Sequence, residues 1–361
     1  MKQLLAAGLC RRASTSLVSA FLLIGFGQIS KAEELEDQLV IATSGGVIEQ
    51  ILKEQFYEPF TKQTGVKIIP VSIAASTEQF SKVRAMLASG QQEWDIGQAG
   101  AEGLISFRDM LSKLDCKAIP LAAENGIPNT CTDYGMLRWV YGTVIAYNAD
   151  SFPKGKEPQS WADFWDVKKF PGPRGLGDAG APWEAMIPAL LADGVPADKL
   201  FPLDIDRAFR KLDEIKPYVT VWWRTGDQST QILRSGEVVM TNVWSGRALN
   251  AKSSGAPVDV QWNQGLQGTD WWVVFKDAPH PNAAKAFLNF FMSRPEASLA
   301  ITQKAFYDTS NRKALDLLPA SELPMHQTFP DNWNKMVDLD SQWIAENRSM
   351  LIERWTAWLS N

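Results

Sequence analysis

The chain has 361 residues and a formal net charge of −5 at pH 7. This acidic balance argues against nucleic acid or an anionic membrane surface as the partner. The length favours two domains over one core, and two histidines and three cysteines, without the spacing of zinc ligands, argue against metal and histidine chemistry, so we expect no cofactor and no metal.

Residues 1–32 have the pattern of a secretory signal peptide. A basic start precedes an apolar run over 17–29, and the small residues Ser30 and Ala32 suit a cleavage site. The apolar run is shorter than the roughly 20 residues of a membrane-spanning helix, so an uncleaved anchor is the weaker alternative. We expect cleavage after Ala32, which removes four basic residues and no acid and takes the formal net charge from −5 to −9.

Strands and helices alternate over the next hundred residues. Hydrophobic patterning predicts strands over 38–42, 66–71 and 94–97, helices over 47–62 and 76–88, and a further helix after the loop 98–101. This order implies a parallel sheet whose ligand-facing loops lie at the carboxyl ends of the strands.

The cysteines of the exported chain, Cys116 and Cys131, flank a loop that contains Pro120, Gly126 and Pro128. In an oxidising compartment they are expected to form a disulfide, with free thiols as the alternative, and a loop of this length predicts a stabilisation of about 3 kcal/mol.

A second α/β unit of about 120 residues follows a predicted strand at 141–147. Its predicted strands are 219–223, 238–242 and 258–262, and its helices are 161–165, 182–191, 205–215, 229–235 and 246–251. A strand at 272–275 and an amphipathic helix over 282–292 return the chain to the first unit. The chain thus crosses between two lobes near Tyr141 and near Gly268, which predicts a hinge and a cleft.

The predicted organisation after the signal peptide is therefore a first lobe in two parts with a second lobe inserted. The first part of lobe 1 covers 33–141, lobe 2 covers 142–268, and 269–361 holds the return to lobe 1 with the C-terminal helices.

The loop that contains Ser44 and Gly45 lies between the first strand and the first long helix. Glycines allow close approach of the backbone to a ligand, and a helix N-terminus offers free N–H groups. The loop lacks the spacing of a phosphate-binding loop, and a simple strand-to-helix turn is the equal alternative.

Fifteen tryptophans exceed ordinary usage, and their positions separate them into two groups. Those at helical spacing, Trp161, Trp165, Trp355 and Trp358, are predicted to pack in the core. Others fall near strand ends or the second crossing, where aromatic faces could enclose an aliphatic chain or a cation: Trp222, Trp223, Trp244, Trp271 and Trp272. Strand neighbours point to opposite faces, so one residue of each Trp-Trp pair should face the cleft, and the sequence leaves open which.

Three charged residues complete the candidate set. The planar guanidinium of Arg224 suits a carboxylate, with an ion pair to an acid such as Asp227 as the alternative. Glu184 and Asp270 are candidates for an ammonium group, although each taken alone suits a solvated surface acid or a helix cap.

The sequence resembles the periplasmic solute-binding proteins of ABC importers, and among them the spermidine/putrescine-type receptors. The resemblance covers nearly all of the exported chain. It rests on these segments: FYEPFTKQTGVKI (56–68), WDIG (94–97), YGTVIAYN (141–148), SGEVVMTNVWSGRA (235–248), AAKAFLNFFMSRPEAS (283–298) and FYDTSNRKAL (306–315).

The resemblance implies a two-lobed, hinge-closing periplasmic-binding-protein fold of type II, and delivery of a solute to an inner-membrane permease. By position, Trp244 matches a ligand-stacking tryptophan, Tyr307 a cleft tyrosine and Glu184 one carboxylate of polyamine receptors. A second carboxylate of the family falls at about Ala181, and a third falls at about Trp271, beside Asp270.

The aromatic pair that polyamine receptors carry in the first loop is replaced in this chain by Ser44 and Val47. A diamine is therefore undersupplied with countercharge, and Arg224 in the cleft would instead suit a molecule with both an amine and a carboxylate.

We therefore expect a monomeric periplasmic substrate-binding protein, not an enzyme, that captures an ω-amino acid or related zwitterion, with a polyamine as the main alternative. An iron receptor and a hydrolase on the same fold are less favoured. The predicted ligand-binding residues are Ser44, Gly45, Glu184, Trp223, Arg224, Trp244, Asp270, Trp271 and Tyr307.

Overall fold

The computed structural model describes residues 34–73 and 76–360, so the predicted signal peptide lies outside the described residues. The chain divides into two units, Met1–Glu34 and Leu35–Asn361, and the description below concerns the second. Within the described residues no helix combines the length and the apolar character that a membrane crossing requires.

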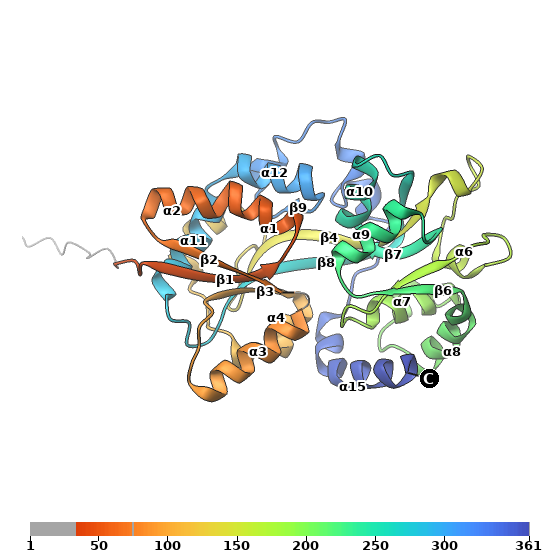
Figure 1. Cartoon of the computed structure of the whole chain (residues 1–361), viewed down its shortest axis with the longest axis horizontal. Helices are drawn as coiled ribbons and strands as arrows, with labels where there is room; N and C mark the ends of the chain where they lie inside the picture. Colours follow the sequence, from red (N-terminus) through yellow and green to blue (C-terminus); the bar gives the residue numbers. More distant parts are fainter. Residues whose placement is uncertain (1–33, 74–75, 361) are drawn as a thin grey trace, which may run out of the picture. The chain divides into compact units, whose positions relative to one another are not determined.

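The strands of the described residues join in one sheet of nine strands (Figure 1). Its order is β2-β1-β3-β8-β4-β7-β5-β6, with β9 paired to β4. The strands are β1 (Gln38–Ser44), β2 (Lys67–Ile73), β3 (Ile96–Gly100), β4 (Met136–Asn148), β5 (Arg174–Gly177), β6 (Val219–Trp223), β7 (Met240–Trp244), β8 (Val258–Val274) and β9 (Asp308–Thr309).

The long strands β4 and β8 form the antiparallel centre of the sheet, and Tyr141 of β4 lies opposite Gly268 of β8. On one side β8 pairs with β3, and the parallel strands β1 and β2 follow. On the other side β4 pairs with β7, and the parallel strands β5 and β6 follow. We call these sides the first half (β2-β1-β3) and the second half (β7-β5-β6). The two predicted crossings thus meet as one residue pair, while the exact lobe boundaries stay a prediction.

Most helices cover one half of the sheet each (Figure 1). Those that precede β4 or follow β8 include α1 (Val47–Leu52), a π-helical segment (Lys53–Tyr57), α2 (Glu58–Thr64), α3 (Ser76–Ser89), α4 (Ala101–Ser106), α5 (Pro120–Asn125), α11 (Pro281–Met292), α12 (Pro295–Ala305), α13 (Arg312–Leu315), α14 (Pro330–Trp333) and α15 (Ser341–Leu359). Those between β4 and β8 are α6 (Trp161–Trp165), α7 (Trp183–Ala192), α8 (Ile205–Ile215), α9 (Gly226–Ser235) and α10 (Ser245–Ser253).

Each half has its own hydrophobic core. In the first, Phe56 and Phe60 of the segment before β2 pack against Phe287 and Phe291 of α11. In the second, Trp161 and Trp165 pack with α7 and α8, as their helical spacing predicted. Two cores on one sheet follow from a chain too long to bury its apolar surface around a single centre.

Two strands differ from the sequence prediction. The segments 258–262 and 272–275, predicted as separate strands, belong to the single strand β8, whose middle carries Gly265, Gly268 and polar residues in place of an apolar pattern. The four-residue strand β5, with the sequence RGLG, has no periodicity that predicts a strand. Both are held by pairing to neighbouring strands, which local patterning does not record.

The predicted disulfide is confirmed: Cys116 and Cys131 are bonded. The bond connects a 3₁₀ turn at Cys116–Ala118 to the segment that enters β4.

The C-terminal helix α15 packs on the second half. Trp355 and Trp358 contact Trp222 of β6, and the Nε1 atom of Trp355 donates to Asp178 at 2.8 Å. The N-terminal part of α15 contacts α4 of the first half, where the Ser106 hydroxyl donates to the Ala345 carbonyl at 3.5 Å. Residues 269–361 therefore supply elements to both halves.

Candidate ligand cavity

A cavity of about 550 Å³ lies where the two halves meet at the central strands. It receives side chains from the ends of β1, β3 and β7, from the middle of β4 and β8, and from the starts of α4, α7, α9 and α10. Carboxyl ends of strands and N-termini of helices converge there, which is where α/β proteins place their ligands.

Seven of the nine residues predicted to bind ligand line this cavity. They are Ser44, Gly45, Glu184, Trp244, Asp270, Trp271 and Tyr307. Ser44 is fixed by Gln98, whose side-chain amide donates to the Ser44 hydroxyl at 2.8 Å and whose carbonyl accepts from the Ser44 N–H at 3.2 Å. Residues separated by more than 260 positions are thus brought together.

Trp223 is not among the lining residues, because it is fully buried behind β7. Its Nε1 atom donates to the Asn242 carbonyl at 3.0 Å, and its ring contacts Trp244 edge to face at 5.2 Å. Its partner Trp222 packs against α15. In the second pair, Trp271 lines the cavity while Trp272 is fully buried.

Arg224 also lies outside the cavity lining. Its side chain is 73% exposed, and its Nε atom forms an ion pair with Asp178 at 3.0 Å. An exposed pair of this kind contributes little to stability. The structure therefore gives Arg224 a surface partner other than the Asp227 named as the alternative.

The arginine that lines the cavity is Arg247, in the first turn of α10. Its side chain is 8% exposed, its Nη1 atom donates to Asp227 at 2.7 Å, and its Nε atom has no partner among the described residues. A buried guanidinium with an unused donor has a strong requirement for an acceptor. The sequence signal was present, since Arg247 belongs to the SGRA segment next to Trp244, but no rule selected it over Arg224.

Glu184, at the start of α7, is the carboxylate without an arginine or lysine partner in the described part of the chain. Its oxygens accept from the Thr143 hydroxyl at 3.0 Å and from Trp244 Nε1 at 3.1 Å. Burial raises the pKa of Glu184 from 4.5 to about 7, and these two hydrogen bonds only partly oppose the rise. An ammonium group in the cavity would supply the missing countercharge.

Four more acids line the cavity: Asp227, Asp338, Glu102 of α4 and Asp270 of β8. Burial raises the pKa of Glu102, and the charge of Arg348 on α15 opposes this. Burial likewise raises the pKa of Asp270 against the opposing effect of Arg138. Sequence patterning did not identify Glu102, because a glutamate in the first turn of a helix is typical of any helix N-terminus.

Aromatic rings form much of the remaining wall. Trp139 stacks on Tyr307 with ring centroids 5.7 Å apart, and Tyr141 contacts Trp244 at 6.5 Å and Tyr307 at 6.1 Å. Burial raises the pKa of Tyr141 well above its ordinary value, and the negative charge of Glu184 raises it further. Such a wall can enclose an aliphatic body and attract a cation.

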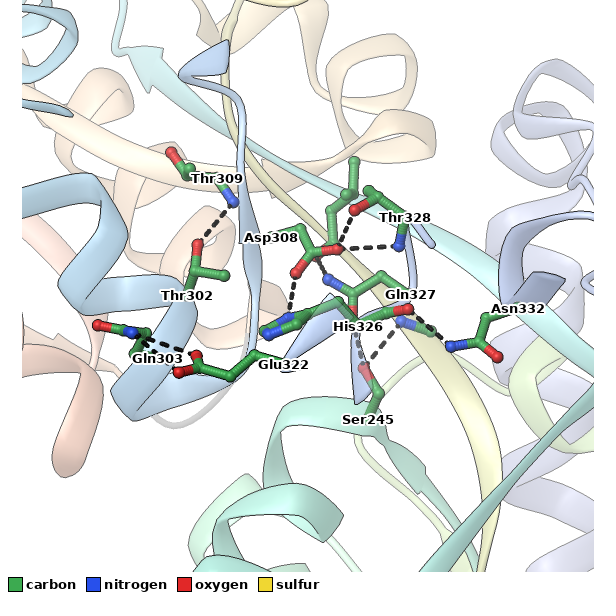
Figure 2. A network of polar contacts seen from close by, with 12 residues as sticks. Ser245, Thr302, Gln303, Asp308, Thr309, Glu322, His326, Gln327, Thr328 and Asn332 are labelled. Carbon is green, nitrogen blue, oxygen red and sulfur yellow. Dashed lines mark hydrogen bonds and ion pairs between the residues drawn. The ribbon is translucent and has the colours of Figure 1, made fainter. Parts of the chain in front are cut away.

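A buried polar network fixes the start of α10, which carries the cavity residues Trp244 and Arg247 (Figure 2). The Ser245 hydroxyl donates to the Gln327 side chain at 3.2 Å and accepts from the Gly142 N–H of β4 at 3.1 Å. The Gln327 amide donates to the Val140 carbonyl at 2.7 Å.

The same network extends to β9, directly after Tyr307. Asp308 accepts from His326 Nδ1 at 2.7 Å and from the Thr328 N–H at 2.9 Å (Figure 2). Apart from His326 Nε2, which is buried without a partner among the described residues, these groups are satisfied by neighbours, so the network supports the cavity wall. Among the described residues no group of three or more His, Cys, Asp or Glu side chains could hold a metal ion.

Comparison with known proteins agrees with this arrangement. Residues 55–331 match the family model described as bacterial extracellular solute-binding protein. The gamma-aminobutyric acid-binding protein of Pseudomonas aeruginosa is 30% identical over 347 residues, which cover 94% of this chain and 96% of that protein. The spermidine/putrescine-binding periplasmic protein of Escherichia coli K12 is 24% identical over 76% of this chain and 79% of its own length.

A solved structure shares the fold. The crystal structure of PBP MotA from A. tumefaciens B6 in complex with glucopine has a TM-score of 0.80 and a sequence identity of 30%, and the match covers 89% of this chain and 99% of that chain. The predicted two-lobed α/β fold of periplasmic-binding-protein type II is confirmed, and so is the resemblance to the solute receptors of ABC importers. The chain belongs to the bacterial extracellular solute-binding proteins and is a substrate-binding protein of an ABC transporter.

Proposed function

We propose that the cavity binds an ω-amino acid or a closely related zwitterion in the periplasm and delivers it to an inner-membrane permease. The observation that carries the proposal is the presence of the buried arginine Arg247 in one cavity with Glu184, a buried acid without a cationic partner. In this proposal Arg247 takes the role that the sequence suggested for Arg224.

The ligand carboxylate binds Arg247, and the ligand ammonium binds Glu184 with Asp270 nearby. Trp244, Trp271 and the tyrosines enclose the aliphatic body, and Ser44 and Gly45 supply polar contacts from the first half. Arg247 and Glu184 both belong to the second half, so their separation selects the length of the ligand. Closure is favoured by the added contacts of Ser44 and Gly45 from the first half, which a ligand makes only in the closed arrangement. The protein needs no covalent step for this role, and we propose that it acts as a monomer and not as an enzyme.

A polyamine is the second candidate, and one observation favours it. The lining acids outnumber the single lining arginine among the described residues; they are Glu102, Glu184, Asp227, Asp270 and Asp338. The polyamine-binding relative supports the same alternative.

Thermal unfolding of the exported protein, freed of bound ligand, separates these candidates. γ-Aminobutyrate, butyrate, butylamine and putrescine share a four-carbon body and differ only in their charged ends. A ligand at 100 times its Kd adds about 2.7 kcal/mol to the unfolding free energy. We expect a large shift with γ-aminobutyrate and small shifts with butyrate and butylamine. A shift with putrescine alone would contradict the proposal in favour of the polyamine.

A further inference from the structure

Arg138 of β4 is a fully buried arginine directly behind the cavity wall. Its guanidinium lies between two indoles, 3.6 Å from the ring centroid of Trp139 and 4.4 Å from that of Trp272. A cation held between two aromatic faces and excluded from water is fixed in position and charge.

Its hydrogen bonds connect it to residues that line the cavity. The Nη2 atom donates to Asp270 Oδ2 at 2.9 Å and also to the Gln98 side chain, and the Nη1 atom donates to the Thr43 hydroxyl at 3.1 Å. Gln98 in turn fixes Ser44. Arg138 therefore contacts the cavity from behind, through Asp270 and Gln98.

The ion pair with Arg138 makes the two carboxylate oxygens of Asp270 unequal. Oδ2 is occupied by Arg138, while Oδ1 is buried without a partner among the described residues. Asp270 can therefore accept one hydrogen bond from a ligand, but its negative charge is already balanced. A balanced carboxylate attracts an ammonium group far less than a lone carboxylate at the same distance does.

The other acids around the cavity also differ in whether a cation balances their charge. Asp227 is paired with Arg247, and Glu102 lies in the field of Arg348. Glu184 has only neutral hydrogen-bond donors. The fifth lining acid, Asp338, is exposed to solvent, where its charge is screened. The charge balance inside the cavity thus leaves countercharge for one ammonium group, although five carboxylates line it.

We propose that Arg138 is a specificity-determining residue, which neutralises Asp270 from behind and so restricts the cavity to ligands with a single ammonium group. This inference rests on the proposed function, because it explains why a zwitterion is preferred to a diamine in a cavity rich in acids. Arg138 acts through Asp270 and does not itself contact the ligand.

The test compares the affinity for putrescine with that for γ-aminobutyrate by calorimetry in four variants. Arg138→Met removes the charge and keeps an unbranched side chain, and Arg138→Lys keeps the charge. Asp270→Asn removes the partner, and the double variant Arg138→Met/Asp270→Asn removes both charges. The ratio of the two affinities reports the charge balance, whereas a general loss of structure would weaken both ligands together.

We expect Arg138→Met to shift the ratio at least about 10-fold towards putrescine, a difference of about 1.4 kcal/mol. Asp270→Asn should shift it about 10-fold the other way, and Arg138→Lys and the double variant should stay within about threefold of the parent. If Arg138→Met and Arg138→Lys give the same ratio, the inference is overturned.

Removing a buried charge can prevent folding, so thermal unfolding is measured for every variant. If Arg138→Met does not fold, Asp270→Asn decides, and an unchanged ratio in that variant rejects the inference. A parent protein that prefers putrescine would instead reject the proposed function, and the effect of Arg138 on the ratio would still be measurable. The two failures are thus distinguishable.

Discussion

Two segments of the second half place an arginine just after a strand that ends in tryptophan. Strand β6 ends in Trp222-Trp223 and is followed by Arg224, while β7 ends in Trp244 and is followed three residues later by Arg247. The first segment is the richer one in sequence, yet neither its arginine nor its tryptophans line the cavity. The second supplies both Trp244 and Arg247.

The position of each strand in the sheet explains the difference. β7 pairs with the central strand β4, so its carboxyl end opens into the cavity between the halves. β6 is the edge strand, and its end lies against α15 and Asp178. The same residue types therefore serve ligand binding at one strand end and packing at the other.

Exchanging the two arginines for methionine gives the largest expected contrast. Arg247→Met should weaken binding of γ-aminobutyrate at least about 100-fold, because loss of a buried charge partner costs about 2–5 kcal/mol. Arg224→Met, at a 73% exposed side chain, should change it less than about twofold. Calorimetry measures both. A greater loss in Arg224→Met would reverse the comparison.

This contrast also marks the limit of what the sequence could predict. Alternating strands and helices and the two crossings were predictable, because they follow from local periodicity and from the return of the chain near Gly268. Of the seven candidate positions that line the cavity, Ser44, Gly45 and Trp244 lie at strand ends, as ligand-facing loops of α/β sheets do, while Glu184 and Tyr307 were indicated by the resemblance to polyamine receptors. The order of strands β7-β5-β6 is not encoded locally, so sequence could not tell that Arg224 follows an edge strand.

Other features of the cavity depend on contacts between distant segments. Arg138 lies in an apolar strand and is separated by 132 positions from Asp270, so nothing nearby in sequence indicates its partner. Glu102 and Arg348 similarly come together only through the packing of α15 on α4.

The pH dependence of ligand binding should distinguish the cavity, which contains Glu184, from the surface ion pair of Arg224. An ammonium ligand binds the ionised form of Glu184, whose pKa in the free protein is about 7 because of burial. The affinity should therefore be roughly 30-fold lower at pH 5.5 than at pH 8. Glu184→Gln should bind weakly and without this dependence. Asp178→Asn, which alters the partner of Arg224, should retain the full dependence, and an equally flat profile there would contradict the assignment.

The same group affects the stability of the free protein with a defined sign. Since folding raises the pKa of Glu184 from 4.5 to about 7, the folded state binds more protons than the unfolded state in this range. This group therefore lowers the unfolding free energy as pH rises from about 4.5 to 7. The loss should be smaller in Glu184→Gln, as measured by denaturant unfolding at both pH values.

The tryptophans give a smaller contrast of the same kind. Trp244→Leu should weaken ligand binding about 10-fold, because the ring lines the cavity and its Nε1 atom donates to Glu184. Trp222→Leu should leave binding within about twofold and lower the unfolding free energy by about 1–3 kcal/mol, because Trp222 packs against Trp355 and Trp358. Calorimetry and denaturant unfolding are measured on both variants, and equal effects on binding would remove the distinction.

Gly226 follows the first segment in sequence and lies against Arg247 of the second in space. Its substitution gives the smallest expected effect. Gly226 begins α9, two residues after Arg224, and an added Cβ there would lie 2.3 Å from Arg247 Nε and 2.7 Å from Nη2. Gly226→Ala should therefore displace the guanidinium and weaken ligand binding about fivefold. If the substitution disturbed only helix α9, it would instead lower the free energy of unfolding and leave binding unchanged. The displacement acts only through Arg247, so Gly226→Ala should add nothing in an Arg247→Met background. An additive loss in that double variant would show that the start of α9, and not the arginine, is what the glycine serves.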